Sequence, residues 1–224
     1  MATTVHEPPQ VARRMPSAAD NGGGGRRDAV PANGNRRLLQ DDSSPASRTG
    51  IWVAIAAITM TFLAFTSALV VRQGASSDWR HLALPRILYF NTLVLLLSSG
   101  TLEIARRRFR SFIYGAEGQR VAVLRALYAT LGLGLLFIAG QYAAWLQLKA
   151  AGLYLATNPN SSFFYVFTAV HGLHVLGGLA GLAYVIRKLN KSALRRSTLN
   201  ATSHYWHFMD VLWVYLLLVL WMKL

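Results

Sequence analysis

Five long apolar runs divide the chain, and they constrain its fold more than any other feature. They cover residues 51–71, 84–105, 122–148, 162–186 and 204–223. A helix needs about 20 mainly apolar residues to cross the hydrocarbon core of a bilayer, and each run is about that long. The runs are continuous rather than alternating, which argues against membrane β-strands. The sequence therefore predicts an all-α integral membrane bundle of five transmembrane helices within residues 51–224.

The first fifty residues have a different composition. They contain no Phe, Trp or Tyr, five of the seven prolines, and a run of four glycines at 22–25. Such a segment cannot bury enough apolar surface to offset the entropy lost on ordering. It is also too long and too rich in proline for the basic start of a signal peptide. We expect residues 1–50 to form a retained, disordered tail.

The chain is strongly basic, with 23 Lys and Arg against 9 Asp and Glu and a net charge of +14. A nucleic-acid-binding protein would carry these charges on one face, but here they lie between the apolar runs. Eighteen of the 23 fall in the tail and in the loops after the second and fourth runs. Because basic residues favour the cytoplasmic side of a membrane, we expect a cytoplasmic N-terminus, a periplasmic C-terminus and no nucleic-acid partner.

Several kinds of chemistry are missing from the sequence. The chain has no cysteine, which excludes disulfides, iron–sulfur clusters and thiolate metal sites. No glycine-rich phosphate loop or Ser/His/Asp arrangement is present. Five spans do not divide into the two matching halves that are common among transporters. This organisation favours a subunit that packs against another protein, with an independent transporter as the alternative.

Histidines and one acid inside the spans are the most informative polar residues, because ionisable groups are costly in a bilayer. His171 and His174 lie in the fourth run, and His207 and Asp210 in the fifth. One interpretation is a metal or haem site between two antiparallel helices. However, the expected depths of the two pairs differ by about 10 Å at 1.5 Å per residue. We therefore prefer hydrogen bonding between helices, with no metal site and no catalytic residue in this chain.

Other buried polar positions receive the same interpretation. Asn91, Ser98, Ser99 and Gln141 are expected to hydrogen-bond between helices. His207 lies three residues before Asp210 on the same helix. The candidates to contact Asp210 from another helix are Glu103, near the inner end of the second run, and the basic residues that flank the inner interface. A proton relay through Asp210 is the alternative, but it requires more titratable groups in sequence than these spans provide.

Glycines of the fourth run and arginines of the loop after it suggest contacts with helices and lipids. Gly172, Gly177, Gly178 and Gly181 make this helix narrow, which allows close helix packing or, alternatively, a groove for an acyl chain. The lipid-headgroup candidates are basic residues near the anionic cytoplasmic surface, namely Arg187, Arg195 and Arg196.

Two segments of the sequence resemble signatures of subunit III of the haem–copper oxidases. One is Phe163–Val175, which contains the His171-Gly172-Leu173-His174 motif, and the other is Tyr205–Trp213. Weaker similarities lie in the family's order around Ser67, at residues 91–100 and at residues 130–145. The resemblance covers residues 51–224, and the five spans are similar to the short bacterial form of the family.

The resemblance implies an accessory role in a complex that reduces oxygen to water and translocates protons during aerobic respiration. A subunit of this family holds no haem or copper, which belong to partner subunits. It packs against catalytic subunit I, in a complex that includes subunit II, and it binds phospholipid. The implied location is the bacterial plasma membrane. The electron donor, cytochrome c or quinol, stays open, as does an accessory role in a nitric oxide reductase.

The family's buried Glu in its corresponding span is replaced by Ile58, so this chain is not expected to contribute that carboxylate.

Overall fold

The computed structural model describes residues 45–75, 85–113, 118–154 and 159–223. These residues form five helices joined by short connections, α2 (Pro45–Ala75), α3 (Ile87–Ile113), α4 (Gln119–Ala150), α5 (Pro159–Asn190) and α6 (Arg196–Lys223). All five are long and apolar enough to cross a membrane. The predicted all-α, five-span architecture is confirmed. The expected tail lies outside the described residues up to position 44, and α2 begins within its last residues.

Each helix extends beyond its predicted apolar run at one end or both, although α3 begins at Ile87, within the run predicted from residue 84. The helices contain 27 to 32 residues, which corresponds to about 40–48 Å at 1.5 Å per residue. The hydrocarbon core is only about 30 Å thick. The additional turns carry polar and basic residues, so they do not register as apolar. They remain helical because the helical backbone satisfies its own hydrogen bonds beyond the hydrocarbon core. Hydropathy therefore located the membrane-embedded part of each helix rather than its ends.

Proline and glycine mark several helix boundaries. Pro45 and Pro159 are the first residues of α2 and α5, where the missing N–H of proline costs no helical hydrogen bond. At the end of α4, Gly152 adopts a positive φ of 77°. The Leu153 amide then donates to the Leu148 carbonyl at 3.0 Å. This geometry satisfies a terminal carbonyl and turns the chain out of the helix.

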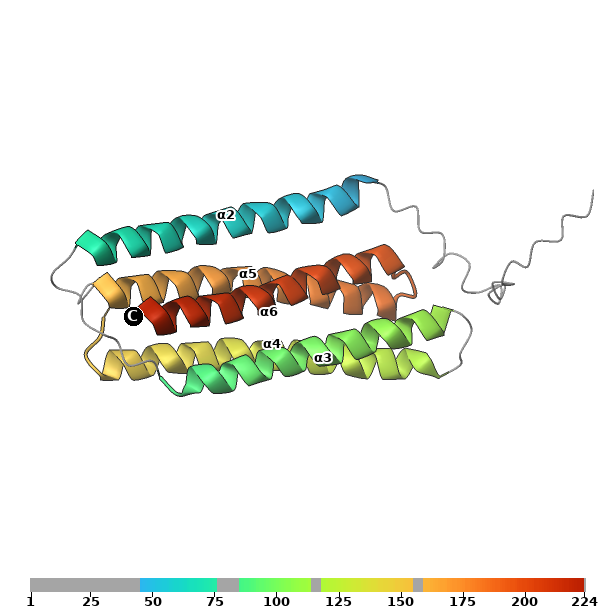
Figure 1. The fold of residues 1–224 in the computed structure, drawn as a ribbon. Helices are drawn as coiled ribbons and strands as arrows, with labels where there is room; N and C mark the ends of the chain where they lie inside the picture. The colour runs from blue at the N-terminus through green and yellow to red at the C-terminus, as the bar shows by residue number, and fades with distance from the viewer. Residues whose placement is uncertain (1–44, 76–84, 114–117, 155–158, 224) are drawn as a thin grey trace, which may run out of the picture.

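The helices form two antiparallel pairs and one additional helix (Figure 1). Helices α3 and α4 pack side by side, as do α5 and α6, and the two pairs contact each other through α4–α5 and α3–α6. Helix α2 packs on the other side of the α5–α6 pair, mainly against α6. Helix α6 therefore contacts α2, α3 and α5.

Large aromatic side chains fill the space between the pairs. Trp206 and Trp213 of α6 and Phe137 of α4 are almost completely buried. The rings of Phe137 and Trp213 pack edge to face with their centres 5.0 Å apart, an arrangement that the aromatic quadrupole favours. These side chains hold α6 against α4, although the two helices lie in different pairs.

Two glycines of α4 allow close contacts with other helices. A Cβ atom at Gly140 would overlap the side chain of Asn91 on α3, and one at Gly134 would lie 2.7 Å from Leu179 and 2.8 Å from Trp206. Asn91 is buried and donates to the Phe137 carbonyl at 3.5 Å. The absence of side chains at these positions thus sets the spacing of α4 from α3, α5 and α6.

Gly134→Ala is expected to lower stability, because the buried indole of Trp206 has no room to move. Overpacking of this kind usually costs about 1–3 kcal/mol. Gly132 is a matched control in the same helix, since a Cβ atom there meets nothing within 4 Å. Thermal unfolding in detergent should show a lower Tm for Gly134→Ala and an unchanged or higher Tm for Gly132→Ala. Equal Tm values would contradict the packing described here.

Candidate functional site

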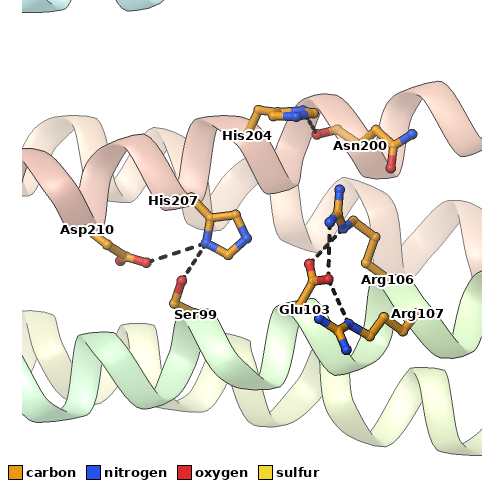
Figure 2. Close-up of polar contacts among 8 residues, drawn as sticks. All are labelled: Ser99, Glu103, Arg106, Arg107, Asn200, His204, His207 and Asp210. Atoms are coloured by element: carbon orange, nitrogen blue, oxygen red, sulfur yellow. Dashed lines mark hydrogen bonds and ion pairs between the residues drawn. The ribbon is translucent and has the colours of Figure 1, made fainter.

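The polar residues of α6 lie against the hydroxyl groups of α3. The hydroxyl of Ser99 hydrogen-bonds to Nδ1 of His207, and the same nitrogen lies 3.9 Å from Oδ2 of Asp210 (Figure 2). The Asp210 side chain is only 6% exposed. Neither of its oxygens has a hydrogen bond of ordinary geometry within the described residues, although Ser99 is close enough to interact with it.

Glu103 was one of the candidates to contact Asp210, but the structure does not bring the two carboxylates into contact (Figure 2). The Glu103 carboxylate binds two arginines of its own helix, with Arg106 Nε at 2.7 Å and Arg107 Nε at 2.9 Å (Figure 2). Arginines three and four residues away lie on the same helix face as the acid. Ser99, one turn farther from the arginines, is the α3 residue beside Asp210.

The histidines of α5 point toward different helices. His171 is fully buried between Phe137 of α4 and Trp213 of α6, with ring centres 5.9 and 5.1 Å away. His174 faces Phe62 of α2, and its Nδ1 lies 2.7 Å from the Val170 carbonyl. The structure therefore does not bring the two imidazoles into one site.

The geometry offers no converging set of metal ligands in the described part of the chain. No three His, Asp or Glu side chains there come close enough to hold an ion. Neither ring nitrogen of His171 has a hydrogen-bond partner among those residues. Its neighbours are aromatic rings, which do not ligate a metal.

Two indoles join α6 to α3 through hydrogen bonds whose donors were not predicted from the sequence. Trp206 Nε1 donates to Oγ of Ser98, and Trp213 Nε1 donates to Oγ1 of Thr92, both at 3.0 Å. The only available signal was their seven-residue spacing, which places both indoles on one face of a helix. These bonds pair the buried indole N–H groups with acceptors and fix α6 relative to α3.

The two predicted amides differ in their contacts. Asn91 bonds across the α3–α4 interface through the Phe137 carbonyl. Gln141 is 4% exposed, and neither polar atom of its amide has a partner among the described residues. The structure thus places Asn91, but not Gln141, in a hydrogen bond between helices.

The glycines of α5 fall into two groups. A Cβ atom at Gly178 would lie 3.1 Å from Trp206, while Gly177 and Gly181 approach Tyr205 and Thr202 of α6 at 3.7 and 3.8 Å. A Cβ at Gly172 would meet nothing within 4 Å. Gly172 instead lines a groove of about 280 Å³ between α4 and α5, together with Ile138, Gln141, Tyr142, Trp145, Thr168, Ala169, Leu173 and Leu176. The first group serves helix packing, and Gly172 belongs to an open surface.

Arginines gather at one end of the bundle. Arg187 and Arg195 are exposed and Arg196 is half-buried. Arg120 was identified in the sequence only by its charge, but its guanidinium donates to the Asn190 carbonyl at 2.9 Å and so caps α5.

At the position of the family's acid, Ile58 packs in the core and is 9% exposed.

Five membrane-spanning helices with buried aromatic and polar contacts define an integral membrane bundle. The sequence matches the family model for cytochrome c oxidase subunit III over residues 50–223. The chain belongs to this family, as the resemblance of the two histidine-containing segments suggested. It is a multi-pass protein of a bacterial plasma membrane.

Named relatives agree with this assignment. The probable cytochrome c oxidase subunit 3 of Mycobacterium leprae is 34% identical over 133 residues, which cover 58% of this chain and 62% of the relative. That of Nocardia farcinica is 31% identical over 67% of this chain and 74% of the relative. The cytochrome bo(3) ubiquinol oxidase subunit 3 of Pseudomonas putida is 26% identical over 77% and 84%. The chain therefore spans just over three fifths of the mycobacterial relative's length.

His171→Phe is expected to leave stability unchanged or to increase it. The imidazole packs between aromatic rings with both nitrogens unpartnered, and leaving a buried polar group unpaired costs about 1–3 kcal/mol. His207→Phe is the control and should lower the Tm, because it removes the hydrogen bond to Ser99. A large loss of Tm for His171→Phe would reveal a polar role for His171 and contradict this interpretation.

Proposed function

We propose that this chain is a non-redox accessory subunit of a bacterial haem–copper terminal oxidase. The complex reduces oxygen to water in aerobic electron transport and couples this reaction to proton translocation. Haem and copper are held by catalytic subunit I and by subunit II, while this chain stabilises subunit I and bound lipid. The family match over residues 50–223 carries this proposal.

The environment of the histidines supports a role without redox chemistry in this chain. The imidazole of histidine is a common ligand of haem iron and of copper. Here His171 packs between Phe137 and Trp213, and His207 binds Ser99. These residues hold helices together, and the chemistry is assigned to the partners.

The electron donor of the complex is cytochrome c in our first proposal and a quinol in the second. The relatives include subunits named for each kind of oxidase. Nothing in the helices of this chain favours one donor, since the donor would bind to another subunit.

We assign the arginine-bearing end of the bundle to the cytoplasm, with the C-terminus in the periplasm. The end of α3, the start of α4 and the α5–α6 turn lie together at that end (Figure 1). They contain eleven basic residues, from Arg106 to Arg125 and from Arg187 to Arg196. This clustering follows the rule that cytoplasmic loops carry an excess of Lys and Arg.

Phospholipid is the ligand that we assign to this chain itself. The α4–α5 groove is mostly apolar and opens toward the membrane at Gly172. Its volume of about 280 Å³ would hold part of an acyl chain. Arg187, Arg195 and Arg196 lie at the end of α5 and the start of α6, where they would contact anionic headgroups.

Affinity purification from native membranes tests the proposed assembly. A tag on the full-length chain should recover a haem-containing complex with the absorbance of a haem–copper oxidase. The chain separated from that complex should carry no haem and no stoichiometric copper or iron. Recovery of the chain without haem proteins under mild detergent conditions would refute the proposed function.

Gly172→Leu tests the lipid assignment. The larger side chain should fill the groove without disturbing the bundle, because a Cβ at this position meets no atom within 4 Å. Mass spectrometry of the purified complex should detect less retained phospholipid, with unchanged haem content. Gly132→Leu is the control, since it adds the same side chain to an open position outside the groove. Equal lipid retention in both variants would remove the groove as a lipid site.

A further inference from the structure

The outward face formed by α3 and α6 combines polar groups with apolar surroundings. We call Ser99, His207 and Asp210 the α3–α6 polar strip (Figure 2). Asp210 is buried, but the side chain of His207 is 37% exposed. Val211, which follows on the same helix face, is 68% exposed, and Leu96, one turn from Ser99, is 51% exposed. The imidazole therefore opens onto a surface that is otherwise apolar.

The depth of this strip follows from the charges that bracket α3. Arg86 and Arg106 are twenty residues apart, which corresponds to about 30 Å of helix and matches the thickness of the hydrocarbon core. Ser99 lies seven residues from Arg106 and thus about 10 Å inside the hydrocarbon. The bonds of α6 to Thr92, Ser98 and Ser99 fix the depth of His207 beside Ser99.

An imidazole at this depth needs a polar partner. Its Nδ1 faces Ser99 and Asp210, whereas no residue in the described ranges hydrogen-bonds to Nε2. Acyl chains offer no donor or acceptor, and an unpaired polar group in hydrocarbon costs several kcal/mol in general. Phospholipid headgroups lie about 10 Å away. A protein segment that spans the membrane is the occupant that supplies a polar group at this depth.

The charges at the arginine-bearing end of the same face also fit a protein partner. Glu103, Arg106, Arg107 and Arg110 line a hollow of about 380 Å³. One carboxylate among three guanidinium groups leaves an excess of positive charge. A partner segment that continues to headgroup depth would be complementary if it carried an acidic residue there.

We propose that the α3–α6 face is the docking surface for a transmembrane helix of the catalytic subunit. That helix would place a hydroxyl, amide, carboxylate or carbonyl group against Nε2 of His207, and an acidic residue near Arg110. The proposal rests on the proposed function, because it takes the catalytic subunit as the partner. It assigns the opposite face, formed by α4 and α5, to lipid.

Photo-cross-linking in the intact complex tests this assignment. A photoreactive phenylalanine analogue is placed at Leu96 or Val211, and at Leu136 or Leu173 as controls, all of which are exposed. Side chains in contact approach within about 4 Å, and the photoreactive group reacts only with atoms that it contacts. Adducts with the haem-bearing subunit should therefore form at Leu96 and Val211 in about tenfold higher yield than at the controls. Adducts at Leu96 and Val211 with a second copy of this chain, or with lipid only, would overturn the proposal.

A pair of bulky substitutions provides an independent measurement. Val211 of α6 and Leu135 of α4 are both exposed, at 68% and 54%, and Leu135 lies outside the groove, so tryptophan at either position should leave the bundle folded. Val211→Trp should lower the haem recovered with the tagged chain several-fold, whereas Leu135→Trp should not. The reverse result would place the partner on the α4–α5 face and overturn this inference alone. If even the unsubstituted chain recovers no haem protein, the proposed function fails and this inference fails with it.

Discussion

The bilayer supplies no hydrogen-bond partners, and the organisation of this bundle follows from that constraint. Backbone groups are satisfied within five helices, and the indoles of Trp206 and Trp213 donate to hydroxyls of α3. Polar groups inside a membrane protein therefore indicate which helices must meet. Where the described chain leaves such a group partly open, as at His207, the same constraint indicates contact with another molecule.

Helix α6 is the element through which these contacts are connected. It packs against α2, α3 and α5, and its side chains reach α4 through the rings of Phe137 and Trp213. Trp206, His207 and Trp213 of α6 hydrogen-bond to hydroxyls of α3. The outward face of α6 carries Val211. A subunit that stabilises a larger assembly benefits from this arrangement, because the helix that would meet the partner is also the helix that organises the core.

The sequence predicted the architecture because apolar length and charge distribution are properties of single segments. It could not predict which residues meet, since those contacts depend on how the helices rotate and shift. Glu103 was one of the candidates to contact Asp210, but local arginines bind it. Gly172 and Gly178 looked equivalent, yet one lines a groove and the other packs against Trp206. Ser99 was expected to hydrogen-bond to another helix, but its partner, His207, became visible only from the relative depth of α3 and α6.

The hydroxyls of α3 also have a consequence for assembly in the membrane. Thr92 donates to the Leu88 carbonyl and Ser98 donates to the Leu95 carbonyl, both within α3. A hydroxyl has one donor and two acceptor positions, so each group retains an acceptor for an indole of α6. Helix α3 is synthesised long before α6, and its hydroxyls need no partner from another helix to enter hydrocarbon. Helix α6 therefore finds hydrogen-bond acceptors on α3 that are still available when α6 is made.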